Sequence, residues 1–462
     1  MKRRLLSLLI LCSSFAAFGQ ITYEKDYASA LKQAKTKKTP LFIFITPDER
    51  ISESNYTSGI SLPEVVTFYN KNFSSLKLTF TSPAGREMAL KYQINRYPYY
   101  LFLDTNENLI FTGFSNSLRS EFFLDLANEV LKRMENKTSI FQLEQQYASG
   151  KRSKSFLKDY ITLRRNTGNT NNATLIEEYV KFLTIGELDN PEEILFILRA
   201  GPLVYGKAFG LAYSNRKLAD DTFLSLPVQE RIDINRAMAD NTLNEAISKR
   251  SFQLAEQVSN FERNINTNYN EGERQSSWKM LLYFKAVGDT TNFFYQATNY
   301  NDRYFMSVSV DSVKRAKAEN QKNIDLIKNF KNQIPKVAKV NPNNNGTSPP
   351  VRTTVTRRVT ISGNGNDVSN FLNTAAWDFY QTGTRNSNHL SKALVWSKRS
   401  IEMEPIPAYY DTLAHLFYRM GLFDEALLNQ KKAIDLSETK PEYSSSIANL
   451  KLELNKMKER TL

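Results

Sequence analysis

The sequence has very few of the side chains on which enzyme chemistry most often depends. Its 462 residues include one cysteine, Cys12, and two histidines, His389 and His415. Cys12 lies inside a segment that looks like a cleaved leader, so the mature chain should contain no cysteine. Thiol–disulfide exchange needs an attacking thiolate and a second sulfur atom. The mature chain is therefore predicted not to be a disulfide oxidoreductase.

Residues 1–19 have the three parts of a secretory signal peptide. A basic start, Lys2 to Arg4, precedes the short apolar run Leu5 to Leu11, and Ala17-Phe18-Gly19 supplies small residues for cleavage. None of the remaining stretches has the ~20 apolar residues of a membrane helix. We expect an exported protein, periplasmic or extracellular, with no integral membrane segment after cleavage.

The formal net charge of +13 is spread along the chain. A concentrated basic patch would indicate a protein that binds nucleic acid. Beyond the leader, however, the clusters of basic residues are short, such as Lys151-Arg152 and Arg357-Arg358. We therefore expect no nucleic-acid partner.

Lipid attachment at Cys12 remains an alternative to a freely soluble exported chain, although the residue before it, Leu11, is not small.

Residues 20–135 alternate between helical and extended patterns. Leu41 to Ile45 is a continuous apolar run, which is typical of a strand buried on both faces. Further strands are predicted at 73–78, 99–103 and 109–113, and helices at 27–34, 62–72, 85–92 and 118–134. This order predicts an α/β domain whose mixed sheet is covered by helices on both faces.

Three segments of this region resemble the thioredoxin-like superfamily, in particular its exported bacterial members. They are KTPLFIF at 38–44, YNKNF at 69–73 and ALKYQINRYPYYLFLD at 89–104. Pro98 falls where the family has a cis-proline before a strand. The resemblance implies that the backbone beside this proline pairs with an extended peptide, so Tyr97 and Pro98 are the candidate peptide-binding residues. Whether Tyr97 packs into the core or flanks a groove stays open at this point.

The departure from the family lies where its Cys-x-x-Cys motif would begin a helix. Residues 46–55 read TPDERISESN and contain no sulfur. Asp48, Glu49 and Glu53 are interpreted as caps and dipole partners of a helix rather than as general acids. The resemblance therefore implies the thioredoxin-like fold without its redox activity.

Residues 136–334 have apolar side chains at spacings of three and four, which predicts helices almost throughout. Short breaks at glycine separate hairpin-like pairs, so we expect a repeat-like helical domain. The acid pairs Glu177-Glu178 and Glu192-Glu193 are interpreted as solvated helix faces. Residues 335–367 are rich in Asn and Pro and are predicted to be a flexible linker.

Residues 368–462 resemble tetratricopeptide (TPR) repeats. One repeat has the family's helix-packing residues, which are Pro407, Tyr410, Leu413, Ala414, Phe417, Gly421, Ala426 and Ala433. An irregular copy precedes it at 369–405, and a polar helix follows at 442–458. The resemblance implies a module of α-hairpins that binds peptides. We expect this module to be independent of the helices before the linker.

No catalytic motif, metal-ligand spacing or phosphate-binding loop occurs in the sequence, so we predict no cofactor and no metal. His415 is interpreted as a packing or surface residue and His389 as exposed. These expectations favour a redox-inactive scaffold or adaptor of the cell envelope, with protein or peptide partners and no enzymatic activity. Two alternatives stay open. One is a structural or assembly component without specific peptide recognition, and the other is an enzyme that uses non-thiol chemistry.

Overall fold

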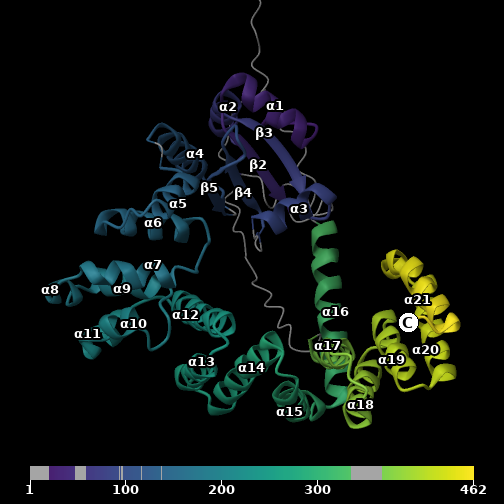
Figure 1. Cartoon of the computed structure of the whole chain (residues 1–462). Helices are drawn as coiled ribbons and strands as arrows, with labels where there is room; N and C mark the ends of the chain where they lie inside the picture. Colours follow the sequence, from purple (N-terminus) through teal and green to yellow (C-terminus); the bar gives the residue numbers. More distant parts are fainter. Residues whose placement is uncertain are drawn as a thin grey trace, which may run out of the picture. The chain divides into compact units, whose positions relative to one another are not determined.

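The structure is a computed structural model in which residues 20–46, 59–92, 94, 97–115, 117–136, 138–333 and 367–462 are described. The leader predicted at 1–19 and the acids Asp48, Glu49 and Glu53 lie outside these residues, as does all but the last residue of the linker predicted at 335–367. The chain divides into two compact units, Met1–Thr242 and Leu243–Leu462, here called unit 1 and unit 2. It is mostly helical, with one small sheet near its start (Figure 1).

Unit 1 begins with alternating strands and helices, and their predicted order is confirmed with one short strand, β1, added at the start. In chain order the elements are β1 (Tyr23–Glu24), α1 (Tyr27–Lys37), β2 (Leu41–Thr46), α2 (Pro63–Asn72), β3 (Ser74–Thr79), α3 (Pro83–Lys91), β4 (Tyr99–Leu103), β5 (Leu109–Phe114) and α4 (Ser120–Glu135).

The five strands form one mixed sheet in the order β1-β3-β2-β4-β5. β2 lies in the centre, parallel to β3 and antiparallel to β4, so that Phe42 pairs with Ser75 on one side and Phe102 on the other. β5 completes a hairpin with β4. Asp104 shapes its turn, because Oδ1 accepts hydrogen bonds from the backbone N–H groups of Asn106 and Asn108 at 2.8 and 2.9 Å.

The central strand β2 is buried on both faces, as its apolar sequence predicted. All five residues from Leu41 to Ile45 are 0% exposed. The side chains at 41, 43 and 45 pack against α1 and α3. On the opposite face Phe42 lies 4.9 Å from the ring of Tyr69 in α2, and the Tyr69 hydroxyl donates to the carbonyl of Phe123 in α4. Helices therefore cover both faces of the sheet.

The rest of unit 1 is helical, as the spacing of its apolar residues predicted. The elements are α5 (Ile140–Ala148), α6 (Lys154–Asn166), α7 (Ala173–Tyr179), the 3-10 turn η2 (Val180–Phe182), α8 (Ile185–Leu188), α9 (Pro191–Arg199), α10 (Lys207–Ala212), α11 (Arg216–Leu224) and α12 (Val228–Ser248). Helix α12 runs past the division between the units. A capping box starts α5, in which the side chains of Ser139 and Gln142 each accept the other's backbone N–H.

One acid that was interpreted as part of a solvated face is buried instead. Glu193, in the first turn of α9, is 7% exposed. Its Oε1 accepts from the Tyr179 hydroxyl at 2.7 Å, and its Oε2 accepts from Lys158 Nζ at 2.8 Å. Burial, and next the hydrogen bond to Glu193, raise the pKa of Tyr179. The solvated interpretation of Glu193 is therefore wrong, because partners from α6 and α7 enclose it.

The other three acids of the two predicted pairs are less buried than Glu193. Glu192 is exposed, as expected. Glu177 accepts the backbone N–H of Ala208 at the start of α10, at 3.0 Å. Glu178 pairs with Arg152 at 2.6 Å. Only one member of the two predicted pairs is therefore buried, and the local sequence does not distinguish it.

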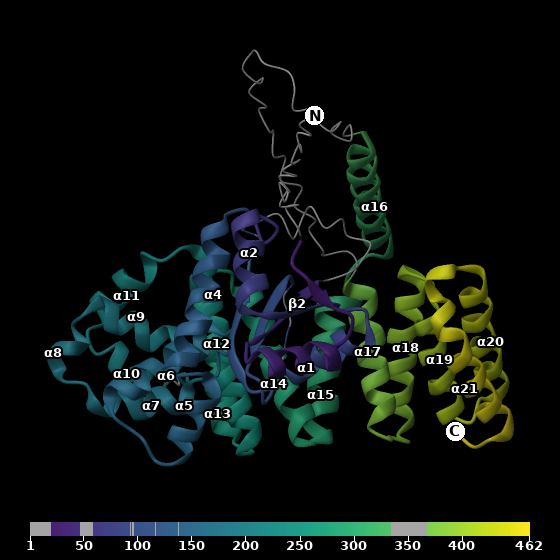
Figure 2. The same cartoon turned by 90° about the horizontal axis from the view of Figure 1, so that it is seen from above.

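Unit 2 consists of helices, most of which pack on the next helix in the chain. They are α13 (Phe252–Ile265), α14 (Tyr269–Val287), α15 (Thr290–Asn301), the π-helical turn η3 (Asp302–Met306), α16 (Val310–Gln333), α17 (Asp367–Gln381), α18 (Ser387–Met403), α19 (Pro407–Arg419), α20 (Phe423–Thr439), the 3-10 turn η5 (Pro441–Ser446) and α21 (Ile447–Glu459). In both views α17 to α21 lie side by side (Figures 1 and 2).

One hydrophobic core joins the helices on the two sides of residues 334–366. Phe294 of α15 lies 4.7 Å from the ring of Phe379 in α17, in an edge-to-face contact. Phe379 in turn lies 4.9 Å from Trp396 in α18. The C-terminal helices are thus packed onto the helices that precede the predicted linker, which differs from the independent module that we expected.

A buried polar contact fixes the place of α18 in this core. Trp396 is 0% exposed, and its indole Nε1 donates to Asp302 Oδ1 at 2.9 Å. The second oxygen of Asp302 accepts from Lys392 Nζ at 2.8 Å. Asp302 is the first residue of the π-helical turn η3. This turn therefore supplies the carboxylate that satisfies the one polar atom of a fully buried indole.

We expect Trp396→Ala to lower the free energy of unfolding by about 3–5 kcal/mol, because it leaves a cavity in the core of unit 2 and removes the donor to Asp302 Oδ1. Val395→Ala is the matched control, since the neighbouring Val395 is 48% exposed; its effect should stay within about 0.5 kcal/mol. Urea unfolding followed by circular dichroism measures both. Equal losses of stability in Trp396→Ala and Val395→Ala would contradict the assignment of Trp396 to the core of unit 2.

We expect Glu193→Ala to lower the free energy of unfolding of unit 1 by about 1–3 kcal/mol, because the buried Tyr179 hydroxyl loses its acceptor. Glu192→Ala removes the same charge from the same helical turn and should cost less than about 1 kcal/mol. Thermal and urea unfolding of the two variants test this difference. If Glu192→Ala were the more harmful change, the assigned burial of Glu193 would be wrong.

Candidate functional site

The residues predicted to bind a peptide lie at one edge of the sheet of unit 1. β2 ends at Thr46, and the residue after β3, Phe80, donates its backbone N–H to the Thr46 carbonyl at 2.8 Å. Tyr97 and Pro98 directly precede β4, whose first residue, Tyr99, pairs with Ile45 near the end of β2. Tyr97 and Pro98 are therefore placed at the carboxyl ends of the parallel strands, where open α/β sheets commonly bind ligands.

The two residues of this site differ in how much surface they offer. The Tyr97 side chain is half-buried; its ring lies 4.9 Å from that of Phe80, which is 38% exposed. Its hydroxyl is enclosed without a hydrogen-bond partner among the described residues, and burial raises the pKa of Tyr97. Pro98 is buried, and the Tyr97–Pro98 bond is cis, as the resemblance implied.

Tyr97 packs against the core of the sheet and keeps an exposed portion. That it flanks a peptide-binding groove stays a prediction. Tyr100 is fully buried and donates to the Ser115 carbonyl at 2.9 Å. Sequence reasoning missed Phe80. Its position at the carboxyl end of a predicted strand was the available signal.

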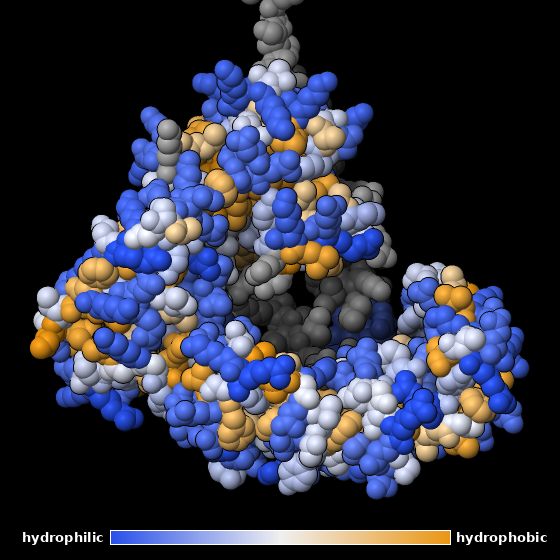
Figure 3. Space-filling view, in the orientation of Figure 1, coloured by the Kyte–Doolittle hydropathy of each residue, from blue (hydrophilic) through white to orange (hydrophobic). Residues whose placement is uncertain are grey.

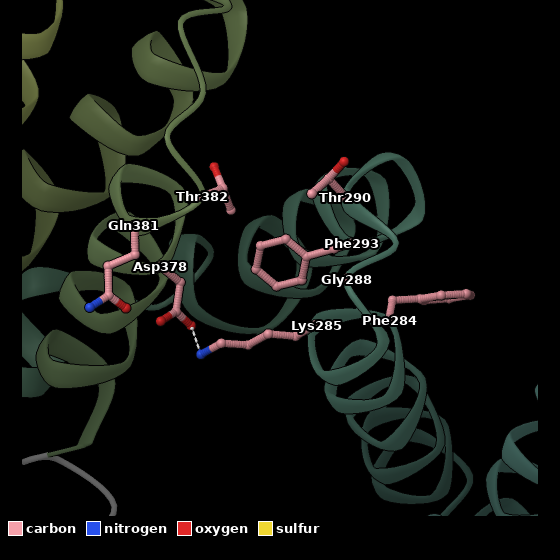
Figure 4. Close-up of a pocket in the computed structure, with 8 residues that line it drawn as sticks. All are labelled: Phe284, Lys285, Gly288, Thr290, Phe293, Asp378, Gln381 and Thr382. Carbon is pink, nitrogen blue, oxygen red and sulfur yellow. Dashed lines mark hydrogen bonds and ion pairs between the residues drawn. The ribbon is translucent and has the colours of Figure 1, made fainter. Parts of the chain in front are cut away.

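A hollow of about 190 Å³ lies in unit 2, between the α14–α15 turn and the end of α17 (Figure 4). Its lining consists of Phe284, Lys285, Gly288, Thr290, Phe293, Asp378, Gln381 and Thr382. Lys285 and Asp378 point toward one another and form an ion pair at 2.7 Å. Because these charges neutralise each other, the rest of the lining offers an apolar ring and threonine hydroxyls to a small bound molecule. The lining does not place a nucleophile beside a general base, as a catalytic site would.

The two histidines are packed rather than presented to solvent. His389 is half-buried and stacks on Phe294, with ring centroids 3.8 Å apart, so it is not exposed as expected. Burial lowers the pKa of His389. His415 is buried on α19, which confirms the packing interpretation. Its Nδ1 lies 2.8 Å from the backbone carbonyl oxygen of Asp411.

Exposed apolar side chains gather on the helical part of unit 1. Figure 3 shows apolar surface over α8 and α11. Ile185 of α8, Leu224 at the end of α11 and Val228 at the start of α12 are each more than half exposed. Surface of this kind marks interaction sites when it is contiguous.

No protein-family model and no curated protein matches the chain. Within the described ranges, no helix is both long enough and apolar enough to cross a bilayer. Nor do these ranges contain three or more His, Cys, Asp or Glu side chains grouped so that they could hold a metal ion.

We expect Tyr97→Phe to leave the free energy of unfolding unchanged within about 0.5 kcal/mol, because the hydroxyl that it removes has no partner among the described residues. Tyr97→Ala should cost about 1–2 kcal/mol, since it also removes the ring that contacts Phe80. Chemical unfolding of both variants measures the difference. A loss in Tyr97→Phe as large as that in Tyr97→Ala would show that the hydroxyl is bonded.

Proposed function

We propose that this chain is an exported, redox-inactive protein with a thioredoxin-like domain and TPR-like helices, which acts as a scaffold or adaptor for polypeptide partners in the cell envelope. One observation in unit 2 carries the proposal. The alternate helices α15 and α17 contact each other, and so do α17 and α19. Stacked helix pairs of this kind leave a continuous face of alternate helices on which extended partners bind. We call the surface of α15, α17 and α19 the alternate-helix face.

The alternate-helix face carries residue types that dominate binding energy at protein interfaces. Trp377 and Tyr380 of α17 are half-buried and stack on each other with ring centroids 5.0 Å apart. The guanidinium of Arg419 in α19 lies 4.2 Å from the centre of the Tyr380 ring and donates to its carbonyl oxygen. The aromatic rings and the cation therefore form one surface across two helices.

Further packing details support the two proposed families. Ala414, Ala426 and Ala433, which belong to the TPR-like pattern, are fully buried where α19 meets α20. In unit 1 the strand order β1-β3-β2-β4-β5 and the cis bond before Pro98 fit the thioredoxin-like resemblance. Export rests on the leader-like sequence at 1–19 alone.

We expect Arg419→Ala to reduce the capture of polypeptide partners by at least about fivefold, because removal of an interface hot spot costs more than ~1 kcal/mol. Arg385→Ala is the matched control, since Arg385 is exposed in the α17–α18 turn, and it should leave capture unchanged. The measurement is affinity capture of the mature chain from its native envelope after cross-linking, with quantification by mass spectrometry.

Unchanged capture by both variants would exclude the alternate-helix face as the binding surface. Retention of wild type and both variants in one large envelope complex, without any discrete partner, would favour a structural component instead. Circular dichroism of each variant must match the wild type, so that a loss of binding is not a loss of folding.

A further inference from the structure

Two helices of unit 1 end together at the edge of the sheet where the parallel strands begin. α1 ends at Lys37 and leads into β2, and α2 ends at Asn72 and leads into β3. The two connections touch, because the Ser74 N–H donates to the Pro40 carbonyl at 3.0 Å and the hydroxyls of Thr39 and Ser74 lie 3.0 Å apart. The carboxyl ends of α1 and α2 therefore meet here, although the helices cover opposite faces of the sheet (Figure 2).

Exposed lysines gather at these two helix ends. We call them the lysine edge; they are Lys35, Lys37, Lys38 and Lys71. Among the residues that the structure describes, none of the four forms an ion pair. The acids at this end of the sheet are Asp104 and Glu107 in the β4–β5 turn, which lies on the other side of β2 from β3. The lysine edge is therefore a patch of one charge sign.

The stability of α1 does not account for all of these lysines. Lys35 and Lys37 are in the last turn, where a cation interacts favourably with the helix dipole. Lys38 instead follows the helix in a left-handed conformation, with φ of 55°, at a position where glycine or asparagine is usual. A lysine at this position adds positive charge without favouring the end of the helix.

The chain enters unit 1 beside the lysine edge. Asn70, in the last turn of α2, accepts the Thr22 N–H at 2.8 Å and donates to the Gln20 carbonyl at 3.4 Å. Residues 1–19 are thus joined to the domain at this point, and they contain the apolar run Leu5 to Leu11. The nine residues from the end of that run to Gln20 span about 30 Å at most. A bilayer that holds the apolar run therefore lies within this reach of the point where the chain enters.

We propose that the lysine edge binds the surface of a bilayer that contains anionic phospholipid. All four side chains are exposed, so they reach separate headgroups of a flat surface instead of enclosing one anion. Each lysine near such a surface strengthens binding by about fivefold, and the attraction falls off within ~10 Å at ~0.1 M salt. After cleavage of the leader the same charges would keep the chain at the membrane. The proposal involves unit 1 alone, so it does not depend on the alternate-helix face.

Sedimentation with lipid vesicles tests the proposal directly. The chain that begins at Gln20 is used, so that the leader itself cannot insert. Vesicles of equal parts phosphatidylcholine and phosphatidylglycerol are compared with vesicles of phosphatidylcholine alone. We expect binding to the anionic vesicles to be at least about tenfold stronger, and to be lost as the salt is raised from ~0.05 M to ~0.5 M.

Two matched pairs of lysines separate the lysine edge from a general effect of charge. Lys37→Gln/Lys38→Gln should weaken binding to the anionic vesicles at least about fivefold. Lys431→Gln/Lys432→Gln removes two adjacent exposed lysines from α20 and should bind as the wild type does. Lys71→Gln, added to the first pair, should weaken binding further, because it comes from the other helix of the same edge. Circular dichroism of each variant must match the wild type.

Three results would overturn the proposal. One is equal binding of the wild type to anionic and neutral vesicles, which does not depend on any variant. Another is an equal loss in the two pairs of variants, which would show that only the net charge matters. The third is a loss of binding to soluble polyglutamate in Lys37→Gln/Lys38→Gln without a loss of binding to vesicles. That result would assign the lysine edge to an acidic polypeptide instead of a membrane.

Discussion

The helices of this chain depend on one constraint: a helix with a single apolar face is stable only where its neighbours cover that face. α17 shows the constraint clearly. Its Leu372, Ala376 and Phe379 are fully buried, and the covering side chains come from α15 before it and α18 after it. Residues 243–333 and 367–462 therefore contribute to one core. A boundary placed from sequence composition alone does not correspond to a boundary in packing.

The order of elements was predictable where the sequence signal is local. The run Leu41 to Ile45 identified the central strand, because a strand buried on both faces needs apolar side chains at every position. β1 was not predicted, because a strand of two residues is too short to show an alternation of apolar and polar side chains. The start of α3 was predicted too late, since Ser82 caps the helix by accepting the Gly85 N–H and places Pro83 in the first turn.

The polar contacts were not predictable, because each joins groups from different helices. Glu193 and Glu192 are adjacent and chemically identical, yet only Glu193 meets Tyr179 and Lys158. Asp302 gives no sign in the sequence that it will satisfy the indole of Trp396. The candidate site follows the same rule. The resemblance placed Tyr97 and Pro98 at the sheet edge, but burial of Pro98 and the contact with Phe80 required the folded chain.

These buried polar contacts have a common consequence for an array of helices. Apolar faces alone allow two helices to slide along each other at little cost, since one methyl-rich surface resembles the next. A buried donor such as Trp396 Nε1, or the amide of Gln430, finds its acceptor in one register only. In any other register it is desolvated without a partner, which costs about 1–3 kcal/mol. We infer that the polar pairs fix the register of neighbouring helices, and that this register sets the pattern of side chains that α17 and α19 present at their surface.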